Sequence, residues 1–274
     1  MLVTLNEVLR DAKEKHYAVG LFNTINFIMA RGVIEAAEEA KSPVIIGTAE
    51  VLLPYAGLHD LAPLLTDMAK RASVPVVLHF DHGLSPELVK KAVELGFTSV
   101  MYDCSTLGYE ENMKAVRDMT VWCHERGITV EGELGHVGDN GGETSPYTEP
   151  DKAAEFAAET GVDALAVAIG TAHGAYKSAP KLDFERLSQI AGLVDAPLVL
   201  HGGSGLSDED FRRSIAGGIA KVNIFTDISH AAARAIHGNY TPELGIAELM
   251  PAAVDAVKCE TMRKMELFGC VGRA

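Results

Sequence analysis

Three histidines in this sequence stand where a short apolar run ends, and each has a glycine or a carboxylate beside it. They are His82 in LHFDHG (78–83), His173 in GTAHGAYK (170–177) and His201 in HGGSG (201–205). Imidazole nitrogens are common zinc ligands, and three protein ligands with one open coordination position are typical of catalytic zinc. Any one of the three could instead be a hydrogen-bonded residue at the end of a strand. Three at equivalent positions favour a shared zinc ion, which we predict here.

Carboxylates accompany these histidines. Asp81 directly precedes His82, and it could either orient an imidazole or move protons as general acid and base near the substrate. Asp103 and Glu133 also end predicted strands, where they could hold a second cation or accept hydrogen bonds from loop amides. His79 is expected to support a metal ligand from behind without binding the ion itself.

A glycine-rich turn follows His201. Successive backbone N–H groups at Gly202, Gly203 and Ser204 could cradle an anion, and the helix expected after Ser207 would add positive potential. The turn could equally be a tight loop with no ligand. Its position beside His201 favours a phosphate site, to which NIFT (223–226) at the next strand end would contribute.

Eight short, apolar, β-branched segments must position these residues, and helical patterns lie between them. The predicted strands are 17–22, 42–47, 74–80, 97–102, 128–134, 163–169, 196–201 and 220–225. Alternating strands and helices imply a parallel sheet, and eight such units favour an α/β (β/α)₈ TIM barrel, with an open doubly wound sheet as the competitor. In a barrel, the carboxyl ends of the strands carry the active site, and this is where the polar residues fall.

No linker divides the chain, so we expect one barrel domain over residues 1–274. A helical extension over about 228–274 could cap the barrel or form an oligomer contact. The glycine-rich segment 135–150, which includes His136, is the expected mobile active-site loop.

The composition limits the function classes. The net charge of −14 argues against nucleic-acid binding. The four scattered cysteines suit a reducing cytoplasm better than a disulfide framework. The N-terminal segment has an amphipathic helix pattern unlike a signal peptide, and no apolar run nears the about 18 residues that a membrane span needs. We therefore expect a cytoplasmic protein without a membrane or nucleic-acid partner.

Several motifs together resemble the class II, metal-dependent ketose-bisphosphate aldolases, which include fructose-bisphosphate and tagatose-bisphosphate aldolases. The motifs are DHG, GFTSVMYDCS, VEGELG, TAHGAYK with PKLDF, and LVLHGGSG, and the similarity runs from AVGLFNTINF to KVNIFTD. The resemblance implies a zinc-dependent lyase that reversibly cleaves a phosphorylated ketose to dihydroxyacetone phosphate and an aldehyde. It also implies a homodimer or homotetramer.

The resemblance assigns residues one by one. His82, His173 and His201 match the zinc ligands, Asp81 matches the catalytic proton donor, and Asp103 and Glu133 match a second cation position of some members. The segments matching those that hold dihydroxyacetone phosphate comprise Gly174, Gly202, Gly203, Ser204, Asn223, Ile224, Phe225 and Thr226. Lys177 falls near the phosphate segment without an assigned role.

The sequence departs from the family pattern in places that concern the aldehyde and the proton chemistry. The family loop carries a Glu-Asp pair, whereas this loop reads GDNGGETSPYTEP, so Glu143 is the candidate catalytic acid there and Asp139 the second choice. Thr106 stands where the family usually has a histidine, and Phe225 stands at a position that is small or acidic in better-known members. The resemblance therefore leaves the aldehyde partner open, and a bisphosphate need not be the native substrate.

Other functions remain open at the level of sequence. The barrel could act on a different phosphorylated sugar or sugar acid, or bind a sugar phosphate without catalysis. A zinc hydrolase would leave the phosphate cradle unexplained. A Schiff-base aldolase would need an inward strand lysine, for which Lys221 is the candidate.

Overall fold

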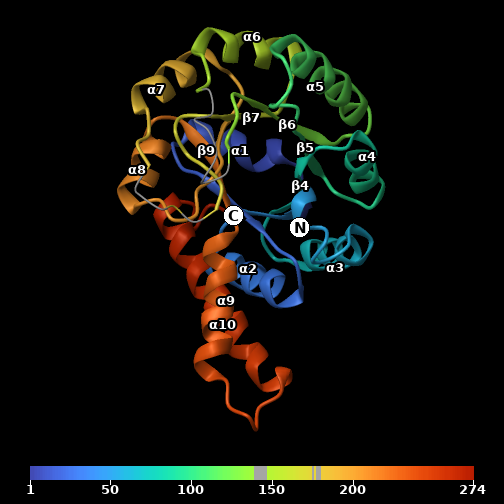
Figure 1. Cartoon of the computed structure of the whole chain (residues 1–274), viewed down its shortest axis with the longest axis vertical. Coiled ribbons are helices and arrows are strands. Elements are labelled where there is room, and N and C mark those ends of the chain that lie inside the picture. Colours follow the sequence, from blue (N-terminus) through green and yellow to red (C-terminus); the bar gives the residue numbers. More distant parts are fainter. Residues whose placement is uncertain (139–146, 175, 177–179) are drawn as a thin grey trace.

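The computed structural model describes residues 1–138, 147–174, 176 and 180–274. Eight parallel strands close into a barrel with helices between them, as predicted (Figure 1). The barrel strands are β2 (Val19–Asn23), β3 (Val44–Ala49), β4 (Val76–Gly83), β5 (Ser99–Tyr102), β6 (Thr129–Leu134), β7 (Ala164–Val167), β8 (Leu198–Leu200) and β9 (Ile219–Ile224). Neighbours in sequence are neighbours in the barrel, and pairing of β9 with β2 closes the ring. This closure excludes the open doubly wound sheet.

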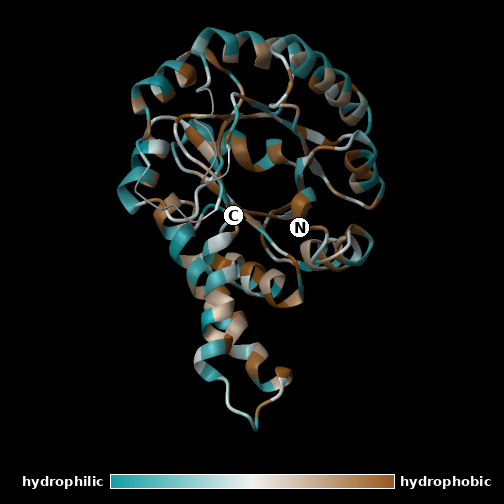
Figure 2. Ribbon diagram, in the orientation of Figure 1, coloured by the Kyte–Doolittle hydropathy of each residue, from teal (hydrophilic) through white to brown (hydrophobic). Residues whose placement is uncertain are grey.

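The helices surround the barrel. They are α2 (Phe27–Ala40), the short 3₁₀ helix η1 (Glu50–Leu52), α3 (Leu58–Arg71), α4 (Pro86–Glu94), α5 (Tyr109–His124), α6 (Pro150–Thr160), α7 (Phe184–Leu193) and α8 (Asp208–Ala216). Figure 2 shows their hydrophilic outer faces and the apolar residues turned toward the strands. Each helix carries its apolar residues along one stripe, and this stripe packs against the barrel. That packing provides most of the stability of the helix.

The amino terminus differs from the predicted continuous helix. Leu2–Val3 forms the short strand β1, which pairs in parallel with β4, and α1 (Leu5–Glu14) begins after Thr4. The Glu7 carboxylate accepts the Thr4 backbone N–H at 2.7 Å, which satisfies a donor at the helix start. The amide of Leu5 donates to Thr129 Oγ1 at the start of β6, so α1 lies across the amino end of the barrel (Figure 1).

The carboxyl-terminal helices form an arm. Helix α9 (Thr226–Asn239) runs away from the barrel, and α10 (Ile246–Phe268) returns beside it and packs against α2 (Figure 1). The Phe268 carbonyl accepts the Ala18 amide at 3.0 Å, so the end of α10 is joined to the chain just before β2. Within the described part of the chain, the structure contains no helix that combines the length and apolarity needed to cross a bilayer.

Candidate metal centre and active site

The three predicted zinc histidines meet at the carboxyl end of the barrel. His82 lies near the end of β4, His173 follows β7, and His201 follows β8 directly. The ring centroids are 4.5 Å apart for His82 and His201, 4.8 Å for His82 and His173, and 5.9 Å for His173 and His201. One nitrogen of each ring lies within 4.8 Å of the others, so a single ion can be reached by all three.

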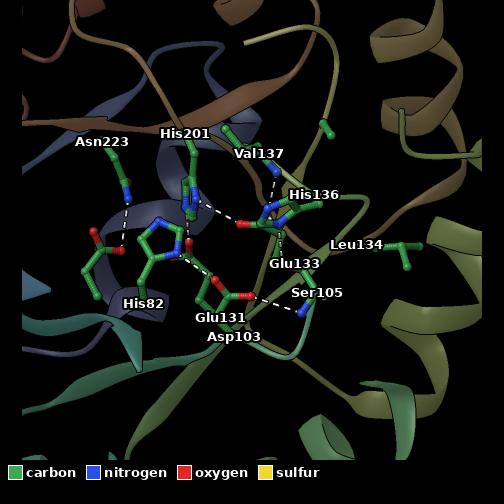
Figure 3. Close-up of polar contacts among 12 residues, drawn as sticks. His82, Asp103, Ser105, Glu131, Glu133, Leu134, His136, Val137, His201 and Asn223 are labelled. Carbon is green, nitrogen blue, oxygen red and sulfur yellow. Dashed lines mark hydrogen bonds and ion pairs between the residues drawn. The ribbon is translucent and has the colours of Figure 1, made fainter. Parts of the chain in front are cut away.

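The hydrogen bonds of these rings fit a metal ion. Nε2 of His82, Nε2 of His173 and Nδ1 of His201 are buried without a hydrogen-bond partner. The opposite nitrogens of two of the rings are held by carboxylates: His82 Nδ1 lies 2.8 Å from Asp103, and His201 Nε2 lies 2.8 Å from Glu131 (Figure 3). A buried, unpartnered nitrogen is costly, and a carboxylate behind a ligating imidazole is the usual support in zinc sites. The donor set therefore suits a divalent ion such as zinc.

The electrostatics of the centre also favour a cation. Burial lowers the pKa of His201, but the Glu131 and Glu133 carboxylates, 2.8 and 3.0 Å from its two ring nitrogens, outweigh burial and raise that pKa to about 10. Surroundings that stabilise a proton on His201 equally stabilise a metal ion at its free nitrogen. Burial and the positive charge of the other two rings lower the pKa of His173 to about 3, which keeps its lone pair available.

His82 depends on an irregularity in β4. The register of β4 against β5 shifts between Phe80 and Gly83, and His82 has a positive φ of 43°. A bulge redirects a side chain, and a non-glycine residue in the left-handed region stores strain that the surroundings must offset. β4 thus extends three residues beyond the predicted end, and it presents both Asp81 and His82 at the centre.

Asp103 and Glu133 lie behind the histidines. Asp103 contacts His82 through Oδ2 and accepts the Ser105 amide at 3.0 Å through Oδ1. Glu133 accepts the Val137 amide at 3.0 Å, and its other oxygen lies 3.0 Å from His201 Nδ1 without the alignment of a hydrogen bond. His82, Asp103 and Glu133 also offer ligand atoms within 4.8 Å of one another, which is compatible with a second cation there. That second cation position stays a prediction.

The contact between Asp103 and His82 should strengthen metal binding. We expect Asp103→Asn to weaken zinc binding by about 10- to 100-fold, because the imidazole loses the charged acceptor that orients it. Competition with a chromophoric chelator measures this. Asp118→Asn on the exposed face of α5 is the matched control. An affinity equal to that of the control would contradict the orienting role.

Asp81 lines the same pocket with its carboxylate held on both sides. Asn23 Nδ2 donates to one oxygen at 2.7 Å, and Asn223 Nδ2 donates to the other at 3.0 Å. Burial raises the pKa of Asp81, but the positive charges of His82 and Lys221 outweigh it, so the pKa lies well below its usual value. The carboxylate is therefore ionised and fixed in position, as a proton acceptor requires.

A buried network beneath the centre was not predicted. Lys221 Nζ lies 2.8 Å from Glu131 and donates to Asn223 Oδ1 at 2.7 Å, and both Lys221 and Glu131 are fully buried. Lys221 thus connects the acid behind His201 with the amide that holds Asp81. An ammonium paired in this way is a poor nucleophile, which argues against the Schiff-base alternative.

The sequence carries a signal for this network that a period-two analysis would find. His79 with Asp81, Glu131 with Glu133, and Lys221 with Asn223 are each two residues apart on one strand, so each pair shares a face. His79 is fully buried, and its Nδ1 lies 2.7 Å from Ser99 Oγ. Its Nε2 lies 3.8 Å from both Asp81 and Glu131, so support of a metal ligand by His79 stays a prediction.

The glycine-rich turn after β8 has the conformation of a backbone cradle. Gly202 has a φ of +65°, and a Cβ there would lie 2.4 Å from the Ala172 carbonyl oxygen. Ser204 Oγ accepts the amides of Phe225 (3.3 Å) and Asp227 (3.4 Å), which joins this turn to the amino end of α9. Only glycine fits such a close backbone approach, and a helix amino end favours an anion.

A pocket of about 320 Å³ contains most of the predicted site. Its lining includes Asp81, His82, Asp103, His173, Gly174, Gly202, Gly203, Ser204, Asn223, Ile224, Phe225 and Thr226. It also includes Asn23 and His136, which were assigned no role. A larger cavity of about 680 Å³ lies between α1, α6 and α7 at the opposite end of the barrel. Since barrel enzymes work at the carboxyl end, the smaller pocket is the candidate active site. Glu143, Asp139 and Lys177 lie outside the described residues.

Comparison with known proteins identifies the family of this chain. Residues 3–273 match the family model described as "Fructose-bisphosphate aldolase class-II". The chain is 42% identical to the uncharacterized protein YdjI of Escherichia coli (strain K12), with all of both chains covered. It is 38% identical to the fructose-bisphosphate aldolase of Geobacillus stearothermophilus, covering 100% of this chain and 99% of the relative. The crystal structure of the YdjI aldolase superposes over 100% of both chains with a TM-score of 0.93. The chain therefore belongs to the class II fructose-bisphosphate aldolase family, and it is a carbon–carbon lyase.

Proposed function

We propose that the protein is a zinc-dependent aldolase that reversibly cleaves a phosphorylated ketose to dihydroxyacetone phosphate and an aldehyde. One observation carries the proposal: three buried imidazole nitrogens without partners lie within 4.8 Å of one another, and two of their rings, His82 and His173, line the same pocket as Asp81 and the glycine-rich turn. His82, His173 and His201 would hold a divalent ion, which would supply Lewis acidity for the negative charge that develops on the ketone oxygen of the substrate. The residues of the chain must then bind the phosphate and move the protons.

Asp81 is suited to the proton on the C4 hydroxyl group. In the cleavage direction its ionised carboxylate accepts this proton while the C3–C4 bond breaks, and the aldehyde forms. In the condensation direction it returns the proton to the new alkoxide. The amides of Asn23 and Asn223 keep the carboxylate in one orientation for both directions. A second acid is needed for the C–H proton of dihydroxyacetone phosphate, for which Glu143 is the proposal from the sequence.

The backbone cradle is suited to the phosphate of dihydroxyacetone phosphate. Gly202, Gly203 and Ser204 face the pocket together with the start of α9, and an acidic protein can bind phosphate through such amides without a lysine. Gly203 lets the turn pack closely on β9, since a Cβ there would lie 2.8 Å from Val222 Cγ1 and 2.9 Å from the Asn223 carbonyl oxygen.

Two further properties are proposed with this function. The arm of α9 and α10 exposes Tyr240 and Ile246 near its tip, which supports a homodimer or homotetramer with the arm as a contact. Free cysteines at positions 104, 123, 259 and 270 support a reducing, cytoplasmic location.

Proton exchange in dihydroxyacetone phosphate tests the metal dependence without requiring the aldehyde to be known. We expect the protein to exchange a C–H proton of dihydroxyacetone phosphate with deuterated water, to lose this exchange after complete removal of the metal by a chelator, and to regain it with zinc. Proton NMR follows the exchange without any aldehyde present. Exchange that persists in fully metal-free protein would refute zinc dependence, and its absence in the zinc-loaded protein would refute the aldolase reaction.

A further inference from the structure

The closed ring of strands determines which residues face the phosphate cradle across the pocket. β8 and β4 are four strands apart in a ring of eight, so they lie on opposite sides, as do β7 and β3. The cradle follows β8 and joins the start of α9. The residues that follow β3 and β4 therefore line the far side of the pocket, where the aldehyde half of a ketose would extend beyond the metal.

This far side is apolar beyond the two polar residues near the end of β4. Apart from Asp81 and His82, the pocket lining there consists of Ala49, Val51, Leu52 and Leu84. Val51 is 71% exposed and Leu84 is 60% exposed, although both are large apolar side chains. Solvent-facing apolar residues at the rim of a pocket are suited to contact a ligand that carries no charge there.

The described residues on this side offer a second phosphate no cationic partner. Within the described residues, the pocket lining contains neither lysine nor arginine. The amino end of α4, which could otherwise bind an anion, already has one: Glu50 Oε2 accepts the amides of Leu84 at 2.8 Å and Ser85 at 3.1 Å. A phosphate dianion beside the Glu50 carboxylate would be repelled.

We propose that the substrate is a ketose monophosphate, phosphorylated at C1 only, whose aldehyde half is uncharged. This inference rests on the proposed aldolase function and narrows its substrate class. Val51, Leu52 and Leu84 are the residues that contact the aldehyde half, and Glu50 excludes a terminal phosphate by occupying the amides that would bind it.

The test compares aldehydes that differ only by a phosphate. Zinc-loaded protein is given dihydroxyacetone phosphate with glyceraldehyde or with glyceraldehyde 3-phosphate, each as the separate D and L enantiomers. We expect kcat/KM to be at least about tenfold higher for glyceraldehyde of the preferred hand, which corresponds to about 1.4 kcal/mol of discrimination. Deuterium exchange into dihydroxyacetone phosphate is measured in parallel, because it needs no aldehyde.

A charge substitution tests the location. Leu84→Arg should shift the ratio of kcat/KM toward glyceraldehyde 3-phosphate by about tenfold, whereas Val121→Arg on the exposed face of α5 should leave the ratio unchanged. Normal exchange with a preference for the phosphorylated aldehyde would overturn this inference and leave the aldolase function intact. Equal ratios for Leu84→Arg and Val121→Arg would overturn the position assigned to the aldehyde. Absence of exchange would instead reject the proposed function itself.

Discussion

Replacement of His173 or His201 by alanine should leave a folded protein that holds no zinc at neutral pH. The three unpartnered nitrogens are the ligand set, and loss of one leaves too few donors for tight binding. We expect cleavage and deuterium exchange to fall by about a thousandfold or more, because the ion supplies several kcal/mol of charge stabilisation in the transition state. Metal content by inductively coupled plasma mass spectrometry and the exchange rate are the two measurements.

The two substitutions differ in how much they should disturb the folded structure. His201 is fully buried and bonded to Glu131, so its loss exposes the Lys221 network to rearrangement. His173 lies in the loop after β7 and is only partly buried, so His173→Ala should retain the circular dichroism spectrum of the parent. His237→Ala on the exposed side of α9 is the control. Full zinc content in His173→Ala would remove that histidine from the ligand set.

Asp81→Ala should behave differently, with most turnover lost and the zinc retained. Asp81 is held by two amides and has no contact with the ligand nitrogens, so the metal should stay. Loss of a positioned acid–base group lowers kcat by about 10²- to 10⁴-fold. Exchange of the C–H proton of dihydroxyacetone phosphate should persist, since that step uses another group. Steady-state cleavage, metal content and NMR exchange together identify this pattern.

The side effects of the substitution need a control. Removing the carboxylate leaves the amides of Asn23 and Asn223 without their acceptor, which costs about 1–3 kcal/mol of stability per buried group. Thermal unfolding measures that loss. Asp255→Ala on the exposed face of α10 is the control, because it makes the same change in charge without removing a buried hydrogen-bond acceptor. An Asp81→Ala protein with unchanged cleavage would deprive Asp81 of its role, and loss of zinc would show that it supports the metal.

Much of the architecture and part of the site follow from the sequence. Eight apolar β-branched segments separated by amphipathic helices determine a parallel α/β fold, because each segment's periodicity specifies its own partner face. All eight predicted segments overlap observed strands. Polar residues at the ends of those segments must share one edge, since parallel strands end together. His82, His173 and His201 could therefore be grouped from their positions alone.

Which of these polar side chains contact one another was decided only by the tertiary structure. Hydrogen-bond partners such as His201 with Glu131, or Asp81 with Asn223, are 70 and 142 residues apart and depend on the stagger and closure of the barrel. The bulge that turns His82 inward results from the register of β4 against β5 and has no local sequence signature.

The difference has a physical reason. Backbone periodicity and turn chemistry act between near neighbours and can be followed along the chain, so the sequence by itself determined the elements, their order and the end of the barrel where chemistry would gather. The free nitrogen of each imidazole, the pairing of Lys221 with Glu131 and the apolar far side of the pocket depend on contacts between segments far apart in the chain. Those contacts exist only after the ring closes, and they determine the chemistry of the site.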